Sequence, residues 1–287
     1  QDLGDTTEDW SIRTRWLEEL ISELWRHRGL LPGLPAVLKL LSLQDAIPWF
    51  KQKVSDGKEV EAANALFTFV EGKSDSVPGL KLDATEVKSV RRQWKLRTHE
   101  QRYLLRDVLP RLALRAEQIG KILDDNRSQN GIKADLKEIA DNPYILSEQY
   151  QGNDPDDFIP WGIIDRGMMP SPELGGASLA ETDDPRRFRA LLVDALKQEE
   201  AHVFVPADSI IMAVNRRLSV LSEWKRFSFH ERYLEADEDL ISEAVVIRPE
   251  NGRTYLYLRD AYEDERLLEE KLRFLVGGPD IKLSTPV

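Results

Sequence analysis

The sequence predicts a mainly α-helical protein, with helical N-terminal domains followed by a winged-helix-like α+β module that contains a β-hairpin. Apolar residues recur at spacings of three and four along much of the chain, as on the buried face of a helix. A β-favouring run at residues 202–206 ends at a proline and precedes a helical pattern. Two further β-favouring runs, residues 244–248 and 254–258, flank Asn251-Gly252, a dipeptide that supplies the positive φ angles of a tight hairpin.

Length and composition limit the classes of protein to which the chain can belong. A chain of 287 residues, with 41% hydrophobic and 32% charged residues, is typical of a soluble globular protein of two or three domains. No run of 18 apolar residues is present, so we expect no membrane partner. The acidic first residues differ from a secretory signal, and the absence of cysteine excludes disulfides and thiol chemistry. These features favour a cytoplasmic location. Because position 1 is Gln rather than Met, we expect a cut or processed piece of a longer protein.

Residues 1–79 are expected to form a helical N-terminal domain. The spacing from Asp5 to Glu8 predicts a capping box before a long helix that ends at Gly29. Further helices are predicted over residues 36–43 and 59–70. Three tryptophans stand at helical core spacing and are expected to pack in the core rather than to stack on bases, namely Trp16, Trp25 and Trp94.

Residues 80–141 are expected to form a basic helical segment. The segment from Glu86 to Lys121 contains ten lysines and arginines and four acids, which gives it a local net charge of +6. Since the net charge of the whole chain is −11, the remaining residues have a net charge of −17. On one continuous helix, spacings of three and four would place six basic residues on one side, namely Lys88, Arg92, Lys95, His99, Arg102 and Arg106. Pro110 is expected to kink or end this helix.

This basic face is the main candidate for a functional site. Cationic groups along one helix side can neutralise successive phosphates, which gives salt-sensitive, sequence-independent binding to nucleic acid. The candidate phosphate-binding residues are Lys88, Arg91, Arg92, Lys95, Arg102 and Arg106. In the winged-helix-like module the candidates are Arg216, Arg217 and Arg253. Two alternatives stay open, a solvated face and a face paired with acids of the same protein. Acids of the module, such as Glu235 and Asp239, oppose contact with DNA.

The rest of the chain divides into a connector and the module. Residues 142–184 are rich in Pro and Gly, yet their apolar residues are expected to pack onto another element. The module spans residues 185–287 and begins with an amphipathic helix that has proline at its first position. Asp208 or Ser209 is expected to cap its second helix. A last helical pattern covers residues 264–275.

No catalytic constellation is recognisable. Phosphate-cradling glycine loops and serine nucleophile elbows are absent, and the four histidines lack the short spacings of metal ligands. Pairs of acids, such as Asp156-Asp157, arise freely in a chain with 51 acidic residues. The chain is therefore expected to hold no metal, cofactor or catalytic residue, with an enzyme of unrecognised type as a third possibility.

Several short segments between residues 138 and 275 carry a family resemblance. They are Asn142-Pro143-Tyr144-Ile145-Leu146, the run Glu199-Glu200-Ala201-His202-Val203-Phe204-Val205-Pro206, the strand Tyr255-Leu256-Tyr257-Leu258, and the helical pattern from Glu265 to Leu275. Together they resemble the region that precedes the motor in RecD-like ATP-dependent DNA helicases, the exonuclease V alpha-chain type. The helix-hairpin-helix glycines of that family have no counterpart here, where Gly152-Asn153-Asp154-Pro155 and Trp161-Gly162 stand instead. The Walker loop is also absent.

The resemblance implies a non-catalytic N-terminal region of a helicase or exonuclease, with a role in DNA repair. This region would bind or guide single-stranded or forked DNA beside its own C-terminal motor, and the chain is expected to stop just before that motor. ATP and Mg²⁺ would then bind to the missing motor domain. The alternative is a protein–protein adaptor that recruits its partner without nucleic acid.

Overall fold

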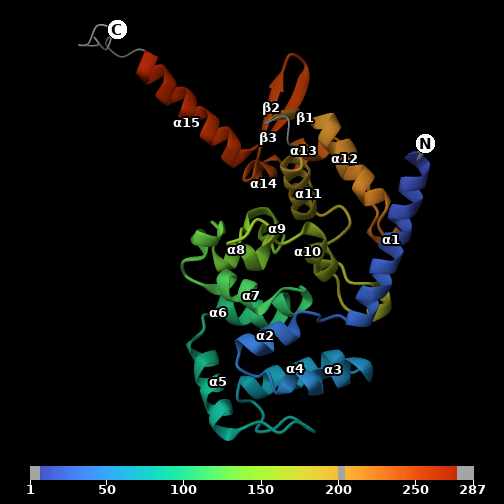
Figure 1. Cartoon of the computed structure of the whole chain (residues 1–287), viewed down its shortest axis with the longest axis vertical. Helices are drawn as coiled ribbons and strands as arrows, with labels where there is room; N and C mark the ends of the chain where they lie inside the picture. The colour runs from blue at the N-terminus through green and yellow to red at the C-terminus, as the bar shows by residue number, and fades with distance from the viewer. Residues whose placement is uncertain (1–6, 200–203, 277–287) are drawn as a thin grey trace, which may run out of the picture.

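Helices form most of the chain in a computed structural model that describes residues 7–199 and 204–276, and the mainly α prediction is confirmed. The first third builds one end of the long axis, with one helix running along the side of the molecule (Figure 1). Its helices are α1 (Thr7–Arg28), α2 (Leu34–Leu40), α3 (Ala46–Ser55), α4 (Glu59–Val70) and α5 (Ala84–Leu96). The side helix is α1, while α2 to α5 lie at the end.

Short helices and turns form the middle of the molecule (Figure 1). In chain order they are α6 (His99–Tyr103), the π-helical turn η1 (Leu104–Val108), the 3₁₀ turn η2 (Leu109–Arg111), α7 (Ala116–Leu123), the 3₁₀ turn η3 (Arg127–Asn130), α8 (Leu136–Asp141), α9 (Ile145–Gln149), α10 (Trp161–Met168) and the 3₁₀ turn η4 (Pro172–Leu174). The predicted kink at Pro110 is confirmed, because the helical path tightens into η2 there.

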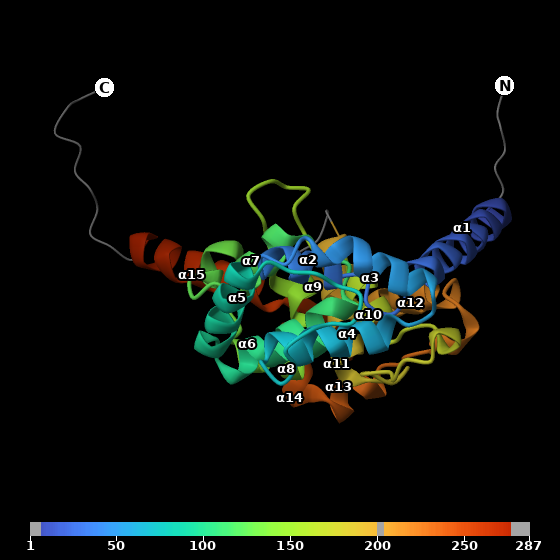
Figure 2. The same cartoon turned by 90° about the horizontal axis from the view of Figure 1, so that it is seen from below.

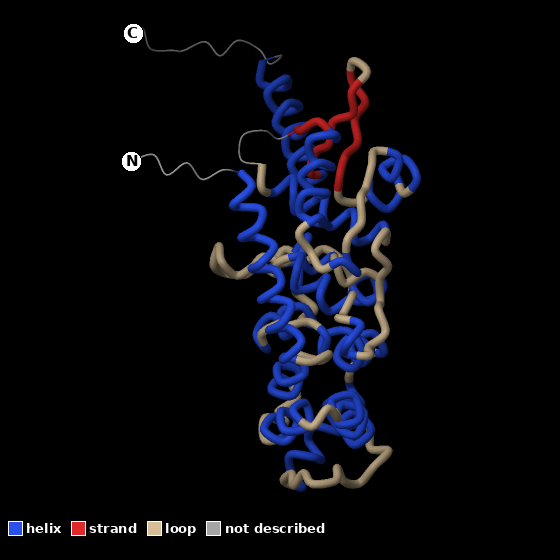
Figure 3. Tube along the Cα trace, turned by 90° about the vertical axis from the view of Figure 1, so that its right-hand side faces the viewer, coloured by secondary structure: helices blue, strands red, loops and turns tan. Residues whose placement is uncertain are grey.

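The opposite end holds all the described strands (Figure 3). Its elements are α11 (Pro185–Lys197), β1 (Phe204–Pro206), α12 (Ala207–Ser219), the 3₁₀ turn η5 (Glu223–Lys225), α13 (Arg232–Ala236), α14 (Glu238–Ser242), β2 (Val245–Glu250), β3 (Arg253–Leu258) and α15 (Arg259–Val276). The sheet is antiparallel throughout, in the order β1-β3-β2. Leu256 of β3 pairs with Val205 on one side and Ile247 on the other, and it is fully buried.

Local sequence signals fix several element ends. Asn251 and Gly252 have φ angles of 51° and 77°, so the predicted hairpin is confirmed. Pro185 opens α11, and the side chain of Asp184 accepts a hydrogen bond from the backbone N–H of Arg186 at 2.9 Å. Gly29, with φ 80°, follows α1 as predicted.

One connected apolar core runs through the molecule from Leu34 to Leu256. The connector contributes to it, because Ile159, Trp161 and Ile164 are buried, and the expectation that this region packs onto other elements is confirmed. The division of the chain into four parts stays a prediction.

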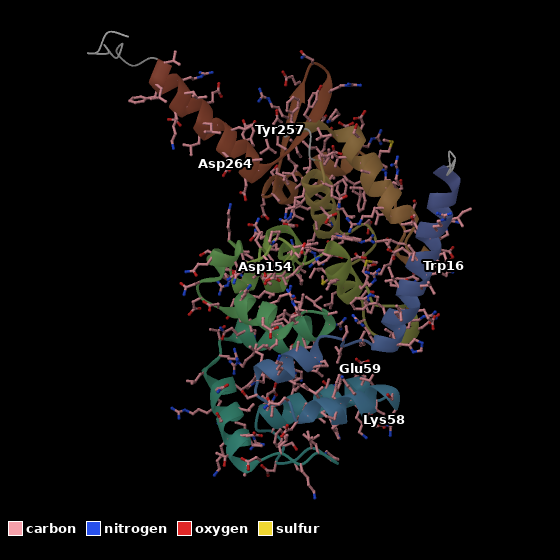
Figure 4. All side chains as sticks on the ribbon, viewed as in Figure 1. Trp16, Lys58, Glu59, Asp154, Tyr257 and Asp264 are labelled. Atoms are coloured by element: carbon pink, nitrogen blue, oxygen red, sulfur yellow. The ribbon has the colours of Figure 1, made fainter. Side chains whose placement is uncertain are left out.

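Some predicted details are wrong. Since α12 begins at Ala207, neither Asp208 nor Ser209 is its N-cap. Trp94 is buried as expected, but Trp16 is 58% exposed on α1, where Figure 4 labels it. Residues 5–6 of the predicted capping box and residues 202–203 of the predicted strand lie outside the described residues.

Close backbone contact joins α2 to η2. Gly33 donates its N–H to the carbonyl of Pro110 at 2.8 Å, and a Cβ at position 33 would lie 2.0 Å from the carbonyl oxygen of Leu112. A side chain there would therefore push two main chains apart.

Gly33→Ala is expected to lower the free energy of unfolding by about 1–3 kcal/mol, the usual cost of overpacking. Gly120→Ala in α7 is the matched control, because its Cβ would meet Leu40 at an ordinary 3.8 Å. That change should stabilise by about 1 kcal/mol through helix propensity. Urea unfolding of the two variants checks the opposite signs, and equal effects would contradict the close contact.

Candidate functional site

Three cations of the predicted basic face lie open on α5. Lys88, Arg92 and Lys95 are exposed, and no hydrogen bond or ion pair ties their head groups to another residue in the described part of the chain. Together with Arg91 and the 78% exposed Leu96 they surround a shallow hollow. These three residues are the part of the prediction that the structure leaves free to bind an anion.

The basic face does not continue as one helix. Arg97 is extended, and Thr98 starts α6 with a capping box, in which its hydroxyl accepts from the N–H of Gln101 and its own N–H donates to the Gln101 side chain, both at 3.2 Å. The predicted continuous stripe from Lys88 to Arg106 is therefore wrong. Arg102 is exposed on α6, separated from the α5 cations by this break.

Two predicted phosphate-binding residues are occupied within the protein. Arg91 donates from Nε to the carbonyl of Phe69 at 3.0 Å, and its guanidinium lies 4.8 Å from the Phe69 ring centroid. Arg106 forms an ion pair with Glu71. Burial raises the pKa of Glu71, but hydrogen bonds from Lys73 and Arg106 outweigh it and hold that pKa below its ordinary value. Arg91 and Arg106 therefore fasten α5 and η1 to the end of α4.

The candidates of the module lie at the other end of the long axis (Figure 1). Arg253 is exposed beside the hairpin turn, and Arg216 is exposed on α12. Arg217 is held by Asp194 and lies 4.7 Å from the centroid of Trp161. The structure therefore does not bring these arginines together with the α5 cations.

Sequence reasoning missed Arg97 as a candidate. Its Nε is buried and has no hydrogen-bond partner within residues 7–199 and 204–276, and burial lowers the pKa of its guanidinium. It directly follows the last turn of α5, at the end of the basic face. A helix-capping signal, Thr98-x-x-Gln101, was present in the sequence and marks the break that places Arg97 there.

A second charged cluster is buried between α10, α11 and η5. Both oxygens of Asp165 are bonded, because Oδ1 accepts from Arg187 Nε at 2.7 Å and from the Tyr144 hydroxyl at 3.0 Å, and Oδ2 accepts from Lys225 Nζ at 3.0 Å. Arg187 also donates to the carbonyls of Thr182 and Lys225. All four side chains are buried. None of them was predicted as a site residue, since the partners stand far apart in the sequence.

Burial sets the protonation of this cluster. Burial lowers the pKa of Lys225 to about 8, although the charge of Asp165 opposes that shift. Burial would raise the pKa of Asp165, but the charges of Lys225 and Arg187 outweigh it and hold that pKa below its ordinary value. Burial also raises the pKa of Tyr144 well above its ordinary range. At neutral pH the cluster therefore holds two cations and one carboxylate.

No group of three or more potential metal ligands occurs within residues 7–199 and 204–276. In the same ranges, no helix combines the length and the apolar composition that a membrane span needs.

Arg187→Met is expected to lower the free energy of unfolding by about 3–5 kcal/mol, because it leaves a buried carboxylate and two carbonyls short of donors. Arg273→Met is the matched control, since Arg273 pairs with Glu269 while 80% of its side chain is exposed. This change should cost less than about 1 kcal/mol. Chemical denaturation measures both values, and comparable losses would contradict a structural role for the cluster.

Stability should depend on pH through Lys225. The pKa of this residue is about 8 in the folded protein and ordinarily 10.5, so the unfolded chain binds more protons between these values and stability rises with pH there. Between pH 7.5 and 9.5, the free energy of unfolding of the wild type should gain about 1–2 kcal/mol relative to Lys225→Met. Urea titrations at the two pH values test this, and a constant difference would refute it.

Comparison with known proteins assigns no family. No family model matches the chain, and no solved structure matches it. A protein of Methanocaldococcus jannaschii, described as "Uncharacterized protein MJ1519", is 25% identical to this chain over 288 residues. The alignment covers 93% of this chain and 23% of the archaeal protein, so the chain spans about a quarter of the length of that relative.

Proposed function

We propose that this chain binds the phosphate backbone of nucleic acid through α5, as a non-catalytic region of a RecD-like ATP-dependent DNA helicase or exonuclease. The observation that carries the proposal is the set of three exposed cations, Lys88, Arg92 and Lys95, which have no hydrogen-bond or ion-pair partner among the described residues. In a chain with a net charge of −11, cations kept away from the protein's own acids are available to an external anion.

The spacing of these cations suits a polyanion. From Lys88 to Lys95 the helix rises about 10 Å, close to the axial rise over three phosphate-to-phosphate steps of about 3.4 Å each on one DNA strand. An array of this kind binds the backbone without reading bases, which agrees with a role in guiding DNA rather than in selecting a sequence.

A larger parent protein is part of the proposal. The archaeal relative is several times longer than the part that aligns with this chain, which supports the idea of a region within a multidomain protein. In that arrangement ATP and Mg²⁺ belong to a motor domain elsewhere in the parent, and the partners of this chain are DNA and that motor.

The second candidate function is a protein adaptor, and the module supplies the observation that favours it. Two features support a winged-helix fold for the module. They are the element order α11, β1, α12, α13–α14, β2, β3 and the sheet order β1-β3-β2. In the position of the recognition helix, however, α13, its N-cap residue and α14 expose acids without ion-pair partners among the described residues, namely Glu231, Glu235, Glu238 and Asp239. Such a surface repels DNA and fits a basic protein partner.

The combined change Lys88→Gln, Arg92→Gln and Lys95→Gln tests the nucleic-acid proposal. Fluorescence anisotropy with single-stranded, forked and duplex DNA at about 50 and 200 mM salt gives the slope of log affinity against log salt. Loss of three phosphate contacts should reduce that slope by about 2–3 and weaken binding at the lower salt about 10-fold or more.

The control is the combined change Lys51→Gln, Lys58→Gln and Lys137→Gln, three exposed lysines outside α5 (Lys58 is labelled in Figure 4). It removes the same charge and should leave affinity nearly unchanged. Equal weakening by both triple variants would reject α5 as the site. If the wild type binds none of the DNAs at about 50 mM salt, the adaptor function is favoured instead.

A further inference from the structure

The last helix, α15, carries apolar side chains that the rest of the described chain does not cover. Its first turn is attached to the sheet end, because Arg259 Nε donates to the carbonyl of Ser242 at 2.6 Å and the Tyr262 ring centroid lies 5.5 Å from that of Tyr257. Every residue from 263 to 276 is exposed. Figure 1 shows the helix extending away from the body of the molecule. Beyond its first turn, the surface of α15 is therefore open to a partner.

The exposed apolar residues of α15 form a seam along the helix. They are 49–85% exposed, and they are Leu267, Leu268, Leu272, Phe274, Leu275 and Val276. Leu268, Leu272 and Leu275 follow one another by four and three, so they lie within about 60° of one another around the helix. This is the spacing of a coiled-coil seam. Most helical stability in proteins comes from packing of the apolar face, and α15 buries none of its own residues. A second helix would supply the missing packing.

The charges beside the seam fit a second copy of α15 that runs antiparallel to the first. Glu269 and Arg273 lie on one side of the seam and form an ion pair within the helix. In an antiparallel pair with Leu268 opposite Leu272 of the other copy, Glu269 of each copy is close to Arg273 of the other. Side chains on a helix lean toward its N-terminus, so Glu269 and the Arg273 of the other copy lean toward each other, while the two Glu269 side chains lean apart.

A parallel pair would instead bring like charges together. Glu265 would face its own copy across the seam, and Asp264 would lie near Glu269 of the other copy. In the antiparallel pair Glu265 meets Leu275 at the end of the shared seam, where its carboxylate reaches water. Lys271 then meets its own copy near the two-fold axis, and its long stem lets the ammonium group turn outward to solvent. The distribution of charge therefore favours the antiparallel pair.

We propose that two copies of this chain associate through α15 as an antiparallel helix pair with two-fold symmetry. Each copy contributes the same surface, as in other two-fold interfaces. The leucines of the two seams bury one another, and two equivalent Glu269–Arg273 pairs set the direction. The association does not depend on nucleic-acid binding, because α5 lies at the other end of the long axis (Figure 1).

The mass of the full chain in solution tests the association. Light scattering after size exclusion, at micromolar to submillimolar concentrations, should give twice the 33.0 kDa of one chain. The combined change Leu268→Glu and Leu272→Glu should weaken association about 100-fold or more, because it places unpaired charges in an apolar seam. A wild-type chain that stays at 33.0 kDa throughout would overturn the proposal.

The control is the combined change Leu17→Glu and Leu24→Glu on α1. These leucines are 51% and 64% exposed, which matches the 60% of both Leu268 and Leu272. The control should leave the mass unchanged. Because all four side chains are exposed, neither variant removes a core contact, and circular dichroism checks that both stay folded. Loss of the dimer in the α1 variant but not in the α15 variant would place the interface elsewhere and reject the proposal.

Spin labels test the direction of the pair. The chain has no cysteine, so Glu263→Cys or Glu270→Cys gives one labelling site on the outer side of α15, opposite the seam. In the antiparallel pair the two labels at position 270 lie level, while the two at position 263 are offset by about 21 Å along the axis. Pulsed electron resonance should therefore give a distance roughly 10 Å longer at position 263. Equal distances at the two positions would show a parallel pair and contradict the proposal.

Discussion

The buried arginines of α11 are the constraint on which the arrangement of the other elements depends. Arg187 bonds to Asp165 of α10, and Arg189 bonds through Nε and Nη2 to both oxygens of Glu148 on α9, each at 3.0 Å. Arg189 also reaches the carbonyl of Leu240 and the carboxylate of Glu243. A single helix therefore connects the middle of the molecule to the sheet end through charges that cannot be left unpaired.

Arg187 and Arg189 both lie on buried faces of α11. Phe188, between the two arginines, stacks on Phe229 with 4.2 Å between ring centroids, and residues 187–193 are all buried. The helix looks amphipathic in sequence because it carries arginines, yet those arginines point into the protein and satisfy buried carboxylates. Charge pairs of this kind set the geometry of the packing more strictly than apolar contacts, since a hydrogen bond tolerates little change in distance or angle.

Signals that act over a few residues were readable from the sequence, and long-range pairing was not. The hairpin at Asn251-Gly252 and the start of α11 follow from turn and cap chemistry within each segment. The basic face failed as a continuous stripe because helical spacing was extended across Thr98, despite its capping signal. The cluster around Asp165 could not be predicted, because its partners stand 21, 22 and 60 residues away and meet only in the folded chain.

The attachment of α1 has a consequence for local stability. None of the side chains of residues 12–28 is buried, and the helix is joined to the body chiefly by polar contacts such as Arg166 with Glu18. Figure 2 shows it projecting from one side of the molecule, opposite α15. The apolar core stays intact when such a helix detaches, so the opening of α1 costs less free energy than global unfolding. The amide hydrogens of α1 therefore exchange with solvent through this local opening, while those of α11 exchange only through unfolding of the core.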